Sequence, residues 1–241
     1  MIRLDRARDI SAMFGDALTL YGRHFTAFFV LGAAIVLPAN LIVSGIGLDQ
    51  LGARYDDQSS AAAAVIPSLV SFLVVAPLVT AACIHALSEA AMGRAPSLGA
   101  ALNAGFEVFA PVFAAVLLAA AGIALGLVAL IVPGVYLAIR WYFVPQTVFL
   151  QRARGVDALR RSGETVRGFW WRAFGIVLLA NLAATIPALL ILVPFDAIAR
   201  SADRELWALV GTGLAQSLTT PFVALISTLL WFDLLARRAG P

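Results

Sequence analysis

Six apolar runs, separated by polar segments, constrain the fold of this chain more than any other feature. A helix needs about 20 apolar residues to cross the hydrocarbon core of a membrane, and these runs approach or exceed that length. They are Phe25–Leu48, Ala62–Ser88, Phe109–Val132, Gly134–Leu150, Trp171–Pro194 and Leu206–Asp233. Pro133 and Gly134 favour a tight turn, so the third and fourth runs are expected to form a helical hairpin. The fourth run is the shortest and carries Arg140.

The composition supports the same interpretation. Of the 241 residues, 61% are hydrophobic and 13% are charged, and the mean hydropathy is +0.92. Soluble domains contain roughly 45–50% apolar and about 25% charged residues. A soluble fold of this length could not bury so much apolar surface, which excludes a large soluble catalytic domain as well as a disordered chain. The single cysteine, Cys83, excludes an intramolecular disulfide and a thiolate metal cluster.

The distribution of arginine predicts how the helices are oriented. All 17 basic residues are arginine. With the N-terminus inside, 13 of them fall in inner segments, three (Arg54, Arg200 and Arg204) fall in outer segments, and Arg140 is left in the membrane. Positively charged segments stay on the cytoplasmic side. The sequence therefore predicts an all-α polytopic bundle of six transmembrane helices in the inner (cytoplasmic) cell membrane, with both termini in the cytoplasm.

Three segments that precede the first, third and fifth runs have the spacing of amphipathic helices. Their apolar residues recur every three or four positions, as on one face of a helix. The three faces are Ile10, Met13, Phe14, Ala17, Leu18 and Tyr21; Leu98, Ala101, Leu102, Gly105, Phe106 and Phe109; and Val156, Leu159, Gly163, Val166 and Trp170. Such helices lie at the level of the lipid headgroups. We interpret the chain as one integral membrane domain, 1–241, with a threefold repeat over 8–88, 97–150 and 155–235. The alternative is three ordinary inner loops that happen to be helical.

Two stretches carry a resemblance to a known group of proteins. Residues 131–145 read IVPGVYLAIRWYFVP, and residues 158–174 read ALRRSGETVRGFWWRAF. Together they resemble small bacterial and archaeal six-span proteins, related to the membrane domain attached to some glycerophosphodiester phosphodiesterases. The segment DALTLYGRHF over 16–25 agrees with this, whereas Gln151 stands where the family often has an acidic residue. Because these residues include no phosphodiesterase domain, the resemblance implies a fold and a membrane setting, without a catalytic chemistry.

Arg140 is the main candidate for an intramembrane site, because arginine is costly in hydrocarbon and is usually functional there. It is expected about 10 Å below the outer end of its run, from where its side chain could also reach the outer headgroups. Asn40 lies at a comparable depth on the first run, and Asn181 and Gln216 lie near the middle of the last two. These polar groups are predicted to face the bundle interior, either as interhelical hydrogen bonds or as a polar cavity with Arg140.

A second candidate site is the basic segment that follows the fourth run. Near a charged surface each arginine could attract anionic lipid headgroups by roughly 1 kcal/mol. The alternative is that these arginines serve orientation and form helical ion pairs, Asp157 with Arg161 and Arg160 with Glu164. The residues of this candidate site are Arg152, Arg154, Arg160, Arg161, Arg167 and Arg172.

The sequence favours a non-enzymatic role. We find no paired carboxylates, no Ser-His-Asp set, no metal-binding motif and no phosphate loop, so no cofactor is expected. The favoured hypothesis is a scaffold or accessory subunit that engages anionic membrane lipids or a partner membrane protein through its basic cytoplasmic face. The alternative is a small transporter or lipid-translocating protein with a polar site around Arg140. An intramembrane enzyme acting on lipids is the third hypothesis, and nucleic acid is not an expected partner.

Overall fold

The structure, a computed structural model, describes residues 7–43 and 68–239, and within them every regular element is helical. The predicted outer loop after the first run, and the start of the second run, lie outside these residues. A π-helical turn, Ser71–Val75, lies near the start of the second long helix, whose described residues begin at Ser68. The α-helices are α1 (Ile10–Arg23), α2 (Phe25–Val43), α4 (Ala76–Ala91), α5 (Leu98–Glu107), α6 (Phe109–Ala129), α7 (Ile131–Arg140), α8 (Val144–Gln151), α9 (Gly155–Val166), α10 (Trp170–Ala202) and α11 (Glu205–Ala239).

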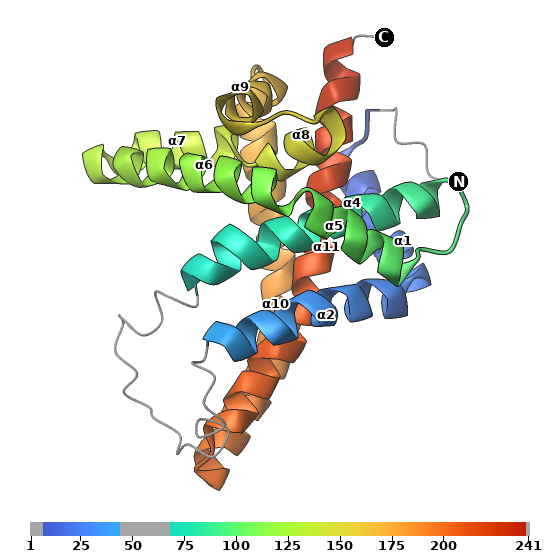
Figure 1. Ribbon diagram of the computed structural model, residues 1–241, viewed down its shortest axis with the longest axis vertical. Coiled ribbons are helices and arrows are strands. Elements are labelled where there is room, and N and C mark those ends of the chain that lie inside the picture. Colours follow the sequence, from blue (N-terminus) through green and yellow to red (C-terminus); the bar gives the residue numbers. More distant parts are fainter. Residues whose placement is uncertain (1–6, 44–67, 240–241) are drawn as a thin grey trace.

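The two longest helices, α10 and α11, form an antiparallel hairpin that runs the length of the molecule (Figure 1). Helices α2, α4 and α6 cross this hairpin at a steep angle in the same view. Helix α11 contacts α1, α2, α4, α9 and α10, which makes it the central element. Its buried face includes Leu225, Leu229 and Leu234, which belong to a core shared with Phe28 of α2 and Ile176 of α10.

Large apolar side chains also cover the outside of the bundle. On α6 the exposed fraction of Val128 is 87%, and on α10 that of Leu190 is 72%. Among the described residues, five helices are long and apolar enough to cross a membrane, and the protein is membrane-embedded. These helices cover Phe25–Ile42, Ser68–Ala91, Phe109–Ala129, Trp170–Ala202 and Glu205–Ala239.

The fourth predicted run is not one helix, and this corrects the prediction of a continuous span over Gly134–Leu150. The chain forms α7, a turn at 141–143, and then α8. Pro145 stands in the first turn of α8 and has no amide hydrogen to donate back toward α7. The Val144 amide bonds the Trp141 carbonyl instead, at 3.2 Å, which tightens the chain into a turn.

The third and fourth runs meet in a hairpin of α6 and α7, as predicted, but the turn lies at Leu130, whereas Pro133 and Gly134 stand in the first turn of α7. Leu130 alone separates the two helices and has extended backbone angles. Glycine permits the close packing of the two arms: a Cβ on Gly126 would lie 3.0 Å from the Gly134 Cα, and a Cβ on Gly134 would overlap the Leu127 side chain. The tip of the hairpin points away from the α10–α11 pair (Figure 1).

The structure places a short helix before each of the three predicted runs: α1 before α2, α5 before α6, and α9 before α10. The predicted apolar faces are only partly correct. On α1, Met13, Ala17 and Tyr21 are buried, but Ile10 and Leu18 are exposed, Leu18 by 59%. Helix α1 packs on α11 through a face that also includes Leu20, so its buried side is rotated away from the predicted one. Phe106 of α5 and Val156 of α9 are exposed in the same way.

The tip of the α6–α7 hairpin yields a test of how it meets the membrane. Leu130, Ile131 and Val132 are each at least 70% exposed in the structure, and keeping one such side chain out of water is worth roughly 1.5–3 kcal/mol. We therefore expect a cysteine at Val132 to resist a membrane-impermeant maleimide applied from either side of the membrane. The native Cys83 is buried and adds little background.

The matched control is Ser201→Cys in the last turn of α10, next to the polar turn that leads to α11; Ser201 is exposed and should react from one side. Labelling of Val132→Cys as fast as Ser201→Cys would show that the hairpin tip emerges into water.

Candidate functional site: a cavity at the helix break

The break between α7 and α8 is stabilised by one hydroxyl group from α9. The Ser162 Oγ donates a hydrogen bond to the Arg140 carbonyl at 2.9 Å and accepts one from the Phe143 amide at 3.2 Å. Ser162 and Phe143 are completely buried. A helix break inside an apolar bundle leaves backbone groups that must find other partners. Ser162 supplies both partners at once, so the turn can persist away from water.

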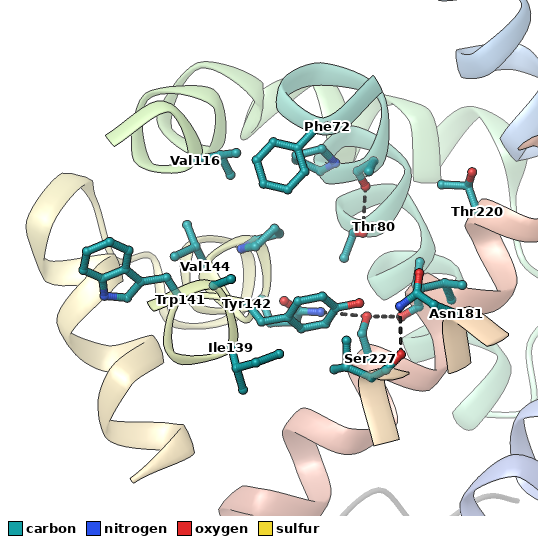
Figure 2. Close-up of a pocket in the computed structure, with 18 of the residues that line it drawn as sticks. Phe72, Thr80, Val116, Ile139, Trp141, Tyr142, Val144, Asn181, Thr220 and Ser227 are labelled. Atoms are coloured by element: carbon teal, nitrogen blue, oxygen red, sulfur yellow. Dashed lines mark hydrogen bonds between the residues drawn. The ribbon is translucent and has the colours of Figure 1, made fainter. Parts of the chain in front are cut away.

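The break forms one wall of a cavity of about 620 Å³. The other walls are the start of α4 with its preceding π-turn, the middle of α6, and the facing sides of α10 and α11. Figure 2 shows Tyr142 reaching from the turn toward Asn181 of α10, with Phe72 and Val116 on the opposite side. Trp141 packs so closely on α6 that a Cβ on Gly122 would overlap its ring.

The lining of the cavity is mostly apolar, with uncharged polar groups. None of the described residues that line it is Asp, Glu, Arg or His. The polar lining residues are Thr80, Tyr142, Gln146, Asn181, Thr185, Thr219, Thr220 and Ser227. Such a lining suits an apolar or amphipathic ligand that carries no net charge where it binds, because an unpaired charge would be costly there.

Gln146 is the most buried of these polar residues, with an exposed fraction of 1%. Its Nε2 donates to the Ser227 Oγ at 3.0 Å, and the Ser227 Oγ donates to the Ala224 carbonyl at 2.9 Å. The other end of the amide, Oε1, is buried without a hydrogen-bond partner among the described residues. Buried polar atoms nearly always have a partner, so an orphaned acceptor in a cavity wall marks a place where a ligand or a water can bind.

The exposed residues of the cavity lining are Phe72 of the π-turn and Asn181 and Thr185 of α10, so the cavity opens between these two elements. Asn181 and Thr185 line it and are themselves exposed, one helical turn apart. Asn181 lies about 16 Å along the helix axis from Trp170, which is far from either end of this long helix. The side chains around this opening, such as Leu178, Leu182 and Ile186, are exposed and apolar. The opening is therefore in the part of the surface that suits lipid rather than water.

The structure does not bring the four predicted intramembrane residues together. Asn181 lines the cavity, but Asn40 and Gln216 bond each other, from Nδ2 to Oε1 at 3.2 Å, and do not line it. Arg140 is exposed at the end of α7, where its Nη1 donates to the Tyr136 hydroxyl at 3.2 Å. A Cβ on Gly163 of α9 would lie 2.7 Å from the Arg140 Nε. The side chain therefore packs across α9, outside the cavity.

The six predicted headgroup arginines divide into two that pair with Asp157, three without a side-chain partner, and Arg172, which pairs with Asp233. Arg160 and Arg161 both bond Asp157, at 2.6 and 2.7 Å, so Arg160 pairs with Asp157 and not with Glu164 as predicted. Hydrogen bonds from Arg160 and then Arg161 lower the pKa of Asp157, so these pairs persist above its ordinary pKa and are lost as the pH falls through the lowered value. The side chains of Arg152, Arg154 and Arg167 are exposed and make no hydrogen bond or ion pair within the described residues.

Arg172 belongs to a buried ion-pair cluster that sequence reasoning missed. Its Nε donates to the Oδ2 of Asp233 at 3.0 Å, and the Arg237 Nε donates to the same carboxylate at 3.1 Å. The Arg8 backbone amide donates to Asp233 Oδ1 at 2.6 Å, while the Arg8 side chain bonds Asp16. Asp233 is completely buried. The cluster joins the N-terminal segment to α10 and α11, which gives Arg172 a structural role.

Sequence reasoning also missed Tyr142, Gln146 and Ser162. Two signals were available: Pro145 lies inside the fourth run, and Gln146 and Thr147 are polar residues in the same run. Neither signal identifies Ser162, because its contacts with the break join residues about 20 positions apart.

Comparison with known protein families, with curated proteins and with solved structures finds no match for this chain. Within the described part of the chain, no group of three or more His, Cys, Asp or Glu residues is placed to hold a metal ion. The resemblance to six-span membrane domains stays a prediction.

The importance of the Ser162 hydroxyl can be tested by Ser162→Ala. The substitution leaves the Phe143 amide and the Arg140 carbonyl without their partner, so we expect the free energy of unfolding in detergent to fall by about 1–3 kcal/mol. Thr165→Val is the matched control, because Thr165 is equally buried on α9 but donates only within its own helix, to the Arg161 carbonyl. Equal losses in the two variants would contradict the role given to Ser162.

Proposed function

We propose that this protein is a non-enzymatic, multi-pass membrane protein that binds a lipid-like amphiphile in the cavity at the α7–α8 break. The observation that carries the proposal is the cavity itself: about 620 Å³, apolar over most of its wall, uncharged, and open toward the lipid-facing side of α10. Ligand sites for small molecules typically measure about 300–1,000 Å³ and combine an apolar lining with a few polar groups.

The position of the opening supports a ligand that arrives from the membrane. Asn181 and Thr185 offer polar atoms amid exposed leucine and isoleucine side chains, so an amphiphile could pass from the bilayer into the cavity without crossing water. A broken helix that lines a binding site is also a recurring feature of membrane transporters. Holding a lipid, or moving it between leaflets, is therefore the role that we assign to the cavity.

The arginine asymmetry supports a finer proposal on topology. The protein would lie in the cytoplasmic membrane with both termini and α9 on the cytoplasmic side. The α7–α8 break contacts α9 through Ser162, so helices α6 and α7 would then form a hairpin that enters and leaves the membrane on the side of α9, with its apolar tip in lipid.

The cavity proposal predicts the effect of filling the space. Ala188 of α10 lines the cavity, whereas Ala197 of the same helix is exposed and does not. We expect native mass spectrometry of the unaltered protein, released from nanodiscs, to detect one retained lipid per chain. Ala188→Phe should reduce the retained fraction about tenfold, which corresponds to a loss of about 1.4 kcal/mol of binding free energy.

Ala197→Phe adds the same ring outside the cavity and should retain lipid as the unaltered protein does. Equal retention by the two phenylalanine variants would mean that any bound lipid lies elsewhere.

A second function, engagement of anionic headgroups by the cytoplasmic face, is supported by a different observation. The side chains of Arg152, Arg154 and Arg167 are exposed and have no ion-pair partner among the residues that the structure describes. Each exposed arginine near an anionic surface is worth roughly 1 kcal/mol. The protein would then act as a scaffold or accessory subunit whose inner face rests on anionic lipid or on an acidic partner protein.

This second function predicts a difference between two sets of arginines. Neutralising the three that lack partners should lower the preference for anionic lipid more than neutralising three that have partners. Replacing Arg152, Arg154 and Arg167 with Gln should weaken the preference for anionic over neutral lipid by at least about tenfold at low salt. Replacing Arg160, Arg161 and Arg238 removes the same charge from side chains that already bond Asp157 or the Glu164 carbonyl. The two triple variants, compared in nanodiscs of graded anionic content, should differ. A loss of equal size in both would leave only a net-charge effect and contradict the assignment.

A further inference from the structure

The hydrogen-bonding pattern of the cavity specifies more than an apolar ligand. The hydroxyl groups of Thr80, Thr185 and Thr219 each donate to a carbonyl of their own helix, at 2.7 to 2.8 Å. A hydroxyl that has used its only hydrogen can offer a ligand lone pairs alone. These three threonines therefore line the cavity as hydrogen-bond acceptors.

The orientation of the Gln146 amide follows from the same reasoning. Ser227 donates its hydrogen to the Ala224 carbonyl, so its Oγ can only accept from Gln146. Gln146 must then turn its Nε2 toward Ser227, which leaves Oε1 as the unpaired atom. Both Gln146 and Ser227 are buried, at 1% and 5% exposure, whereas Asn181 and Thr185 at the opening are exposed. The unpaired acceptor thus belongs to the buried part of the site.

We infer that the cavity takes a neutral lipid alcohol, an uncharged amphiphile whose hydroxyl donates a hydrogen bond to the Oε1 of Gln146 while its apolar chain extends toward the opening at Asn181. The inference rests on the proposed lipid-binding function and names the chemical class of its ligand. An acylglycerol, a long-chain alcohol and a sterol-like alcohol share this chemistry. A lipid that offers acceptors alone, such as an ester or an ether, leaves Oε1 unpaired, and an anionic phospholipid would bring a charge to a wall without a cation among its described residues.

A matched set of three lipids separates these classes on the unaltered protein. The probes are dioleoylglycerol, its 3-O-methyl ether and dioleoyl phosphatidate, each measured by competition against one fluorescent acylglycerol in neutral nanodiscs. We expect dioleoylglycerol to bind about tenfold more tightly than the ether, because one hydrogen bond to a buried acceptor is lost in the ether. Phosphatidate should bind more weakly than dioleoylglycerol.

Gln146→Leu then identifies the acceptor. The variant should bind the alcohol and the ether with affinities within about twofold of each other, and its affinity for the ether should match that of the unaltered protein. The control is Gln151→Leu on the same helix α8, since Gln151 also has a buried unpaired Oε1 but does not line the cavity. This control should keep the preference for the alcohol. Because the lipid series is run first on the unaltered chain, the test holds even if Gln146→Leu does not fold.

The outcomes distinguish the two levels of the proposal. If the alcohol and the ether bind the unaltered protein equally well, the cavity binds lipid but the inference about its class is wrong. If Gln151→Leu removes the preference and Gln146→Leu does not, the acceptor is misassigned and the inference also fails. If none of the three lipids competes, the proposed lipid-binding function itself is contradicted.

Discussion

The hydroxyl group of Ser162 holds together the interruption between α7 and α8, and the cavity depends on that interruption. In an apolar bundle each backbone amide and carbonyl needs a partner, because no water is available to provide one. Ser162 bonds the Phe143 amide and the Arg140 carbonyl at the same time. With both groups satisfied, the chain can turn at 141–143 and direct Tyr142 and Gln146 into the cavity wall. A continuous helix over the same residues would have no such turn.

The same requirement explains why the polar residues of this protein are arranged in small closed groups. Asn40 bonds Gln216, Gln146 bonds Ser227, and several threonines bond their own helices. Asp233 is completely buried and receives hydrogen bonds from the side chains of Arg172 and Arg237 and from the Arg8 amide. Removing one partner of such a buried pair typically costs about 3–5 kcal/mol. Four buried side-chain atoms lack a partner among the described residues, on His85, Gln146, Gln151 and Trp231, and of these residues Gln146 is the one that lines the cavity. Its Oε1 therefore carries information about a ligand.

Much of the fold could be predicted from local patterns. Apolar length identified the long helices, and Pro133 with Gly134 indicated the hairpin of α6 and α7, although its turn lies at Leu130, just before them. The spacing of apolar residues located α1, α5 and α9, but it placed Leu18 on the buried face because spacing alone does not say which neighbour a helix will pack on. The break at 141–143 was missed because Pro145 is compatible with either a kink or a new helix start.

The candidate site could be predicted far less well, because it is made of contacts between distant residues. Gln146 and Ser227 are 81 positions apart, and Arg172 and Asp233 are 61 positions apart. Its position in an apolar run made Arg140 the main candidate. However, the absence of a side chain at Gly163 lets Arg140 lie across α9, outside the cavity. Asn181 was the one predicted intramembrane residue that lines the cavity, and its polar neighbours come from three other helices.

An experimental density map of the protein in nanodiscs made from native membrane lipid would test the account most directly. The account predicts an interrupted α7–α8 segment with Ser162 in the break, and an elongated density that enters beside Asn181 and reaches Gln146. A continuous helix through 141–143, with the side chains of Trp141 and Tyr142 filling the space, would contradict it.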